Sequence, residues 1–231
     1  MYGSKTLGPR TVLLFTGLHD EGRTLFDLDT AASLMKLNRA QTAGVLHAAA
    51  KRGLVTPVKR GLYNLVSFEL GSTTFHLEDR YLLVQASMGE MPYFFSHASA
   101  LDIHQLATQP NSNVYVTSTR RRKDANLGGS PIHFVSSPKS RFFGFANQQM
   151  GKTTIVVSDL ERTLLDAVSL PSYCGGFIEV AKAFFMAKGR LDSVRLLTYG
   201  HRFDKAVVLR RAGYLMAVSY THLTLPTNRE V

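Results

Sequence analysis

The sequence contains a single cysteine, Cys174, and no tryptophan among its 231 residues. One cysteine supports neither an internal disulfide nor a cysteine-based zinc site, which is the usage expected in a reducing cytoplasm. No uncharged apolar run approaches the roughly 20 residues of a membrane-spanning helix. The first ten residues are polar and turn-rich, unlike a signal peptide. These absences predict a cytoplasmic protein with no membrane segment.

Acidic residues are also scarce. The chain has 27 Lys and Arg against 17 Asp and Glu, for a formal net charge of +10. Residues 1–66 hold nine basic and four acidic side chains, so this segment alone contributes +5. Its basic residues cluster after Lys36. A localised positive patch indicates a polyanionic partner.

The N-terminal segment, residues 5–66, has the pattern of a winged helix-turn-helix domain. Pro9 suits a first helical turn, Asn38 is a good N-cap, and Gly53 suits a left-handed helix end. Two short apolar runs follow, joined by Lys59, Arg60 and Gly61. We therefore expect three helices and a two-stranded wing, at residues 9–22, 27–35, 39–52, 54–58 and 62–66.

The outward face of the third helix carries residue types that read DNA. In the major groove Arg pairs with guanine and Gln with adenine, whereas cations further along the helix and on the wing neutralise phosphates. Leu46, Ala49 and Ala50 are expected to face the core. Gly44 is compatible with close approach to DNA or to a neighbouring helix. The predicted contacts to double-stranded DNA are Arg39, Gln41, Thr42, His47, Lys51, Arg52, Lys59 and Arg60.

After a polar joint at residues 67–74, the pattern becomes mixed. Residues 75–217 predict an α/β domain with a small sheet and C-terminal helices, so the whole chain is expected to be α+β. Strands are expected at 114–117 and 132–135, with a turn at Gly128 and Gly129, and at 142–145 and 154–157. Helices are expected at 77–88, 97–106, 159–169, 177–188, 192–199 and 203–216.

Several patterns look catalytic but fail a chemical check. Residues 151–153 mimic the end of a phosphate-binding loop, yet Ala146 stands where that loop needs glycine. Residues 158–161 match a capping box, which explains Asp159, Glu161 and Asp166 as helix architecture. The serines and histidines of residues 96–104 lack both a nucleophile-elbow sequence and metal-ligand spacing. We expect no enzyme activity, no cofactor and no metal site.

Four consecutive cations form a second positive feature, the basic block: Arg120, Arg121, Arg122 and Lys123. The block is expected at a strand end, leading into a hairpin turn. Adjacent cations repel one another unless they are solvated or neutralised. A solvated loop and a contact with DNA backbone or an acidic protein are both compatible with this run.

Three segments together resemble a known family. They are residues 60–63 (Arg-Gly-Leu-Tyr), residues 93–101 (Tyr-Phe-Phe-Ser-His-Ala-Ser-Ala-Leu) continuing to His104, and residues 157–166 (Val-Ser-Asp-Leu-Glu-Arg-Thr-Leu-Leu-Asp). In this order and spacing, over about residues 8–216, the chain resembles the AbiEi antitoxins of type IV toxin–antitoxin, or abortive-infection, systems.

The resemblance implies a transcriptional autoregulator that binds its own promoter through the winged helix. It also implies a C-terminal domain that counteracts a nucleotidyltransferase-like toxin without requiring a stable complex. A palindromic operator would bring two subunits together on DNA. The rival hypothesis is a protein-interaction module whose winged helix reads no DNA and whose basic block binds an acidic partner. No acid–lysine constellation supports a nuclease.

The last residues depart from the pattern. Residues 210–215 resemble the closing helix of the family, but residues 218–231 lose the helical periodicity and contain Pro226. Val-Ser-Tyr-Thr-His-Leu-Thr-Leu-Pro-Thr resembles a translated sequencing adapter. We therefore interpret residues 218–231 as a non-native tail, a hypothesis that resequencing the locus with an independent library tests.

Overall fold

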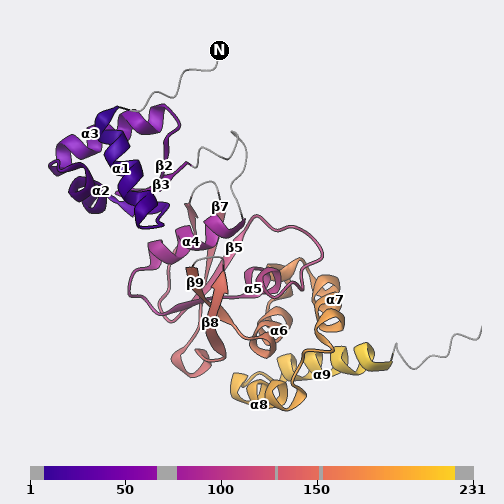
Figure 1. Cartoon of the computed structure of the whole chain (residues 1–231). Helices are drawn as coiled ribbons and strands as arrows, with labels where there is room; N and C mark the ends of the chain where they lie inside the picture. Colours follow the sequence, from indigo (N-terminus) through magenta and orange to yellow (C-terminus); the bar gives the residue numbers. More distant parts are fainter. Residues whose placement is uncertain (1–7, 67–76, 128–129, 151–152, 222–231) are drawn as a thin grey trace, which may run out of the picture. The chain divides into compact units, whose positions relative to one another are not determined.

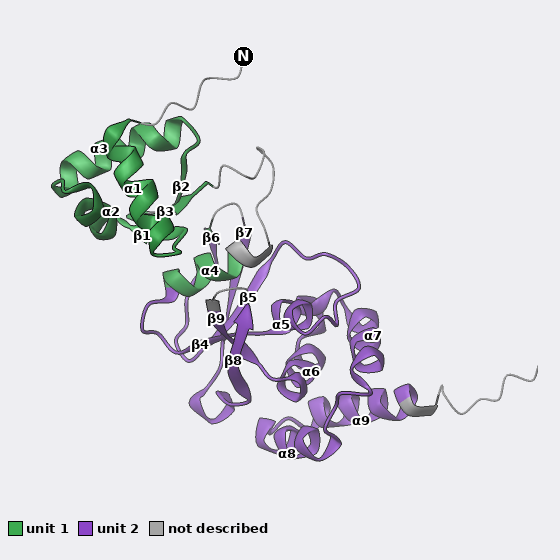
Figure 2. Ribbon diagram, viewed as in Figure 1, with its two compact units in different colours: residues 1–87, 127–129 green, residues 88–126, 130–231 purple. Residues whose placement is uncertain are grey.

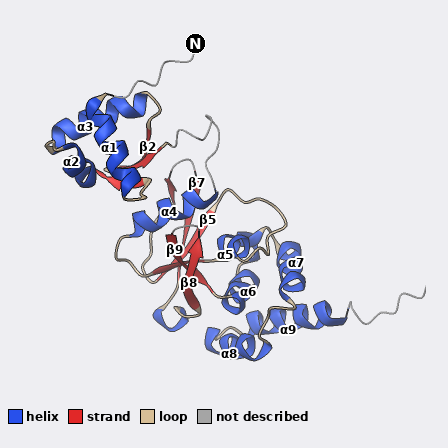
Figure 3. Cartoon of the chain, in the orientation of Figure 1, coloured by secondary structure: helices blue, strands red, loops and turns tan. Residues whose placement is uncertain are grey.

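The computed structural model describes residues 8–66, 77–127, 130–150 and 153–221. The chain divides into two compact units, which are coloured separately in Figure 2. The first comprises residues 1–87 and 127–129, and the second residues 88–126 and 130–231. Helices and strands occur in both units, so the expected α+β class is confirmed (Figure 3).

The first unit is a winged helix-turn-helix, as expected (Figure 1). Its strands form an antiparallel sheet in the order β1-β3-β2. Helix α4 (Leu77–Met88) groups with this unit through residue 87, whereas the second domain was expected to begin at residue 75. The winged-helix elements are α1 (Pro9–Asp20), β1 (Leu25–Asp27), α2 (Leu28–Met35), α3 (Arg39–Lys51), β2 (Val55–Lys59) and β3 (Leu62–Leu65).

Local signals explain the helix-turn-helix boundaries. The Asp27 side chain accepts a 2.7 Å hydrogen bond from the Thr30 amide and caps α2. Lys36 ends that helix in the left-handed region at φ 53°. Asn38 then caps α3, and the core packs Leu14, Leu18 and other apolar side chains of the helices against the sheet.

The second unit is built on a six-stranded mixed sheet with the order β6-β7-β5-β4-β9-β8. Strand pairs β5–β7 and β4–β9 are parallel, while β4–β5 and β8–β9 are antiparallel. All five residues of β5 are buried. The strands are β4 (Tyr93–Phe95), β5 (Val114–Ser118), β6 (Ala125–Leu127), β7 (Ser130–Ser136), β8 (Phe145–Met150) and β9 (Thr153–Ser158).

Two strand predictions are wrong. β5 and β7 do not form a hairpin: they pair in parallel, with Val114 opposite Ile132, and β6 lies between them in the chain. A parallel pair needs a crossover connection, so the apolar runs alone did not reveal their direction. The strand expected at 142–145 begins only at Phe145, because Gly144 turns the chain there at φ 70°.

Helices α5–α9 gather beside this sheet in Figure 1, with α6 in contact with the other four. Apolar side chains of α6, α7, α8 and α9 form one core, which includes Leu165, Phe184 and Leu215. Two short 3-10 helices occur at Lys139–Arg141 and Pro171–Cys174. The α-helices are α5 (His97–Ile103), α6 (Leu160–Ser169), α7 (Phe177–Ala187), α8 (Ser193–Phe203) and α9 (Ala206–Thr221).

The final helix runs past its predicted end at residue 216. α9 continues to Thr221, and the Ser219 hydroxyl donates a 2.7 Å hydrogen bond to the Leu215 carbonyl. Ser219 is buried and its carbonyl accepts a hydrogen bond from Lys188 Nζ. The helical pattern therefore extends into the segment interpreted as a tail. Residues 222–231, and Gly151 and Lys152 of the phosphate-loop mimic, lie outside the described residues.

Candidate functional site

One face of α3 turns inward, and one predicted DNA contact lies on it. Thr42, Leu46 and Ala49 are buried at the helical spacing i, i+4, i+7. Thr42 is 0% exposed, and its hydroxyl donates a 2.8 Å hydrogen bond to the Asn38 carbonyl. The assignment of Thr42 to the DNA-facing side is therefore wrong. Its side chain belongs to the core stripe, one helical turn before Leu46.

A capping box occupies the start of α3. The Asn38 side chain accepts a 2.9 Å hydrogen bond from the Gln41 amide, and Gln41 Oε1 accepts from the Asn38 amide at 3.4 Å. A bidentate contact with adenine uses the Gln41 carbonyl oxygen as well as its amide, so Gln41 would leave the box to make it. Arg39 Nε pairs with Asp29 Oδ1 at 3.2 Å, and the Arg39 side chain is 70% exposed. Such exposed pairs contribute about 0–1 kcal/mol and exchange readily.

Lys51 and Arg52 at the end of α3, and Arg60 of the wing, are exposed. Residues 30–66 contain six Lys and Arg and no acidic residue. Lys36 also lies exposed, at the left-handed turn before α3, and was not among the predicted contacts. The side chain of Lys59, at the end of β2, lies outside the described part of the chain. The predicted contacts found exposed are Arg39, Gln41, His47, Lys51, Arg52 and Arg60.

Small side chains line the outer surface of α3. Ala40, Ala43, Gly44 and Ala48 are all exposed, and with His47 they follow one helical stripe. A Cβ placed on Gly44 would meet no described atom beyond its own helix backbone within 4 Å, so this glycine does not serve contact with a neighbouring described helix. A smooth helix surface flanked by cations fits a groove lined with phosphates. We name the exposed residues of α3, together with Arg52 and Arg60, the recognition face.

The basic block lies between β5 and β6 rather than at a hairpin turn. Arg120, Arg121 and Lys123 are exposed. Arg122 is half-buried: its guanidinium lies 4.7 Å from the centre of the Phe134 ring, and Nη1 lies 3.2 Å from Met88 Sδ. Three of the four cations are therefore available to a partner.

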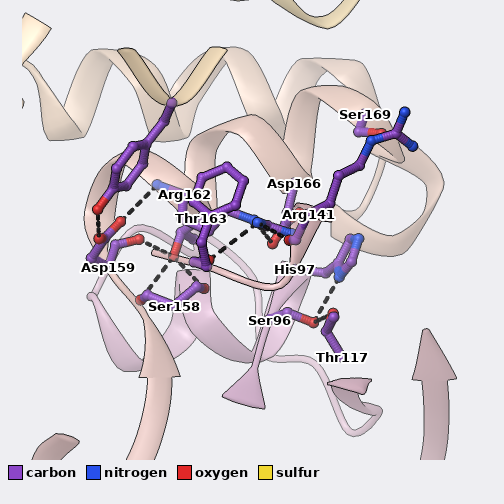
Figure 4. A network of polar contacts seen from close by, with 12 residues as sticks. Ser96, His97, Thr117, Arg141, Ser158, Asp159, Arg162, Thr163, Asp166 and Ser169 are labelled. Carbon is purple, nitrogen blue, oxygen red and sulfur yellow. Dashed lines mark hydrogen bonds and ion pairs between the residues drawn. The ribbon is translucent and has the colours of Figure 1, made fainter. Parts of the chain in front are cut away.

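In the second unit, α6 carries polar side chains into the interior, as Figure 4 shows. Every residue from Glu161 to Val168 is buried. Asp159, not Ser158, is the N-cap: its Oδ1 accepts a 2.9 Å hydrogen bond from the Arg162 amide. The predicted capping box is wrong, because Glu161 instead accepts the Asp192 amide at 2.9 Å and joins α6 to α8. The interpretation of Asp159 and Glu161 as helix architecture is nevertheless supported.

Arg162 is the centre of this network. Its Nε donates to Asp166 Oδ2 at 3.0 Å, and Nη1 donates to the carbonyls of Arg141 and Phe143. The guanidinium also lies about 5 Å from the rings of Phe94, Phe143 and Phe203. Gly144 lets the chain pass close to Arg162, since a Cβ added at residue 144 would lie only 2.9 Å from Arg162 Cβ. A buried charge is tolerated only with such partners.

The residues of the Ser-His-Ala-Ser motif meet the same network. Ser96 Oγ lies 2.8 Å from His97 Nδ1 and accepts a hydrogen bond from Thr117 Oγ1, also at 2.8 Å (Figure 4). Ser158 Oγ lies 2.7 Å from Thr163 Oγ1, and His104 Nε2 lies 2.7 Å from the Ser158 carbonyl. Both histidines make packing and hydrogen-bonding contacts, as predicted. Two segments far apart in sequence are thus joined at the carboxyl ends of β4 and β9.

The two buried histidines predict a pH dependence of stability. Burial lowers the pKa of His97 and of His104 below the ordinary value of 6.5. As pH falls below 6.5, the unfolded chain therefore binds protons that the folded chain excludes, and the free energy of unfolding should decrease. Urea denaturation between pH 7.5 and 5.5 measures this slope. His104→Gln should make the slope shallower than in the wild type; equal slopes in the two proteins would contradict the prediction.

Within the described ranges, no helix is long and apolar enough to cross a membrane. The same residues contain no cluster of three His, Cys, Asp or Glu side chains placed to hold a metal ion.

No protein-family model matches the sequence, and no curated protein sequence matches it. The fold is similar to the crystal structure of the RV2827C protein from Mycobacterium tuberculosis, with a TM-score of 0.73. The match covers 93% of this chain and 78% of that one, at 12% sequence identity. At this identity the similarity concerns the fold alone.

Proposed function

We propose that the protein is a DNA-binding transcriptional regulator that contacts double-stranded DNA through the recognition face. The observation that carries this proposal is the combination of winged-helix topology with a solvent-facing α3 surface of small and basic residues. No acidic residue occurs between residues 30 and 66, and the carboxylate of Asp29 pairs with Arg39 at 3.2 Å. Arg39 is at the start of the helix, where side chains reach base edges, and Arg60 is on the wing.

We further propose that the regulator acts on its own promoter in the cytoplasm, as the antitoxin of a type IV toxin–antitoxin system. The resemblance of residues 93–104 and 157–166 to AbiEi antitoxins supports this role, and these segments meet in one network around Arg162. The partner would be a nucleotidyltransferase-like toxin. Two subunits would pair on a palindromic operator. A neighbouring gene for such a toxin would support the antitoxin role, and co-expression tests whether the protein relieves its toxicity.

DNA binding is tested with the region upstream of the gene, by gel shift and by titration at several salt concentrations. Lys51→Ala and Arg60→Ala should weaken binding to all sequences, and each should flatten the salt dependence by about 0.9 in log–log slope. Arg39→Ala should instead relax sequence preference, by about 1–3 kcal/mol at one base pair.

The matched control is Arg23→Ala. Arg23 is an exposed arginine of the same unit, paired with Glu21 at 3.0 Å and outside α3 and the wing. Removing the Arg23 side chain should leave the salt dependence of DNA binding unchanged. The regulator proposal fails when the wild-type protein binds no upstream DNA at low salt.

The basic block supports a second candidate function, a module that binds an acidic protein. Arg120, Arg121 and Lys123 are exposed and have no carboxylate partner among the described residues. Capture of the neighbouring gene product that depends on these three residues, but not on Arg39, would favour this role. Capture that is unaffected by their replacement with glutamine would exclude it.

A further inference from the structure

A small polar pocket lies beside the Arg162 network, and the proposed DNA contact does not use it. Its volume is about 80 Å³, room for one phosphate group but not for a nucleoside. His97, Thr117, Arg162, Asp166 and Phe203 form its buried floor. Exposed and half-buried residues form its rim: Ser136, Pro138, Arg141, Ser169, Leu170 and Lys205.

Positive charge predominates around this pocket. Arg141, Arg162 and Lys205 all lie within 6 Å of the Phe203 ring centre. Asp166 is the one carboxylate among the lining residues, and its Oδ2 is paired with Arg162 Nε. Arg141 and Lys205 have no carboxylate partner in the described part of the chain. Their polar contacts are long, at 3.4 Å to the Asp204 carbonyl and 3.5 Å to Ser169 Oγ. The lining therefore has an excess of two positive charges.

Hydrogen-bond directions leave donors facing the pocket. Thr117 donates to Ser96 Oγ, so the Ser96 proton is free to bond His97 Nδ1. A histidine that accepts at Nδ1 carries its proton on Nε2. Within the described residues, that Nε2 has no hydrogen-bond partner, although the His97 side chain is only 2% exposed. His97 is also held at φ 51°, which few residues other than glycine adopt.

Arg162 contributes a second donor. Its Nε and Nη1 are engaged, and no hydrogen bond of Nη2 to a described residue is found. Arg162 is 2% exposed and lines the pocket. Two donors of buried side chains, two cations at the rim and the Ser169 hydroxyl thus line one small space. Figure 4 labels four of these residues, His97, Arg141, Arg162 and Ser169. A ligand there must accept hydrogen bonds and carry negative charge.

We propose that this pocket is an oxyanion site that binds a phosphate group, either free phosphate or the phosphate of a small monoester. Arg162 Nη2 and His97 Nε2 donate from the floor, and Arg141 and Lys205 neutralise charge from the rim. Asp166 also lines the pocket, and its negative charge limits how deeply the anion enters, since like charges repel. This inference is independent of DNA binding, because every residue involved belongs to the second unit.

The test uses the full chain in a buffer free of phosphate and sulfate. Inorganic phosphate should raise the thermal midpoint above that in chloride of equal ionic strength, since a ligand that binds only the folded state stabilises it. Calorimetric titration with phosphate and with glycerol 3-phosphate, a small monoester, distinguishes the two sources. Tighter binding of the monoester identifies a phosphorylated metabolite, and equal or weaker binding identifies free phosphate.

The variant Arg141→Gln/Lys205→Gln should lose at least about tenfold in phosphate affinity, because both rim cations are removed. Lys139→Gln removes an exposed cation two residues from Arg141 that does not line the pocket, and should bind as the wild type does. Phosphate should also shift the ¹⁵N resonances of the His97 ring, a readout that needs no variant. No ring shift and no phosphate-specific stabilisation at millimolar phosphate would overturn the proposal, as would equal losses in the rim variant and Lys139→Gln.

Discussion

Replacing Asp166 by asparagine should lower the free energy of unfolding by about 3–5 kcal/mol, because it leaves the Arg162 guanidinium buried without a counter-charge. The two side chains are 2% and 5% exposed, and Nε and Oδ2 are 3.0 Å apart. Arg162 is also held by two backbone carbonyls and three aromatic rings, so it cannot turn outward to be solvated. Urea denaturation of the wild type and the variant measures the difference.

Two further variants test whether the loss of stability is specific to the buried Arg162–Asp166 pair. Lys182→Met breaks the Lys182–Glu179 pair, in which the Lys182 side chain is 47% exposed, and should change stability by at most about 1 kcal/mol. The double variant Arg162→Met/Asp166→Asn should lose less than the sum of the single losses, since residues in one network couple by about 0.5–3 kcal/mol. An Asp166→Asn protein as stable as Lys182→Met would show that the pair does not hold the core together.

Local signals were sufficient to predict the three helices and the two wing strands of the first unit, but not β1, which forms by pairing with β3. Helix caps and turn residues act within four residues of one another, and Asn38, Gly53 and Gly61 all stand where the structure needs them. Thr42 is polar but buried, because helical periodicity and not residue type decides which face of α3 a side chain takes. Its position four residues before Leu46 placed it on the inward face. Strict helical spacing would have removed it from the predicted contacts.

The second unit depends on pairings between distant segments, and the sequence patterns predicted these poorly. An apolar run such as residues 132–135 predicts a strand but not its partner or direction, and here the partner is parallel. The same limit applies to capping. Ser158 matched the capping pattern, yet in the fold its hydroxyl bonds Thr163 and the Phe95 carbonyl, 63 residues away.

The two candidate sites also differ in how much of each could be predicted from the sequence. The recognition face is one helix and one turn, so its cations were visible as a cluster in the sequence. The proposed oxyanion site draws Arg141 from a 3-10 helix, Lys205 from the two-residue link between α8 and α9, and His97 from the start of α5. No spacing in the sequence relates these three residues. They meet because they line one pocket, whose buried floor includes Arg162 and Asp166 of α6.

Replacing Gly44 by glutamate should abolish most DNA binding while leaving the fold intact. Residue 44 is exposed at the middle of α3, and a Cβ there meets no described atom beyond its own helix backbone within 4 Å, so a longer side chain fits the free protein. On DNA, the carboxylate would be held against the groove without a partner. Uncompensated interfacial charges cost about 2–5 kcal/mol, which is at least about a thirtyfold loss of affinity.

Gly44→Ala is the matched control, because it changes the same position without adding charge or length. Alanine is favoured over glycine in a helix interior by about 1 kcal/mol, so this variant should be more stable than the wild type and should retain its DNA affinity. Gel shift and thermal unfolding of the two variants separate binding from stability. Wild-type affinity in the Gly44→Glu protein would mean that α3 does not enter the groove. The cations of the wing and of the basic block would then remain as candidates for contact with a polyanion. Comparing the DNA affinities of Arg60→Ala and Arg121→Ala would decide between these two regions.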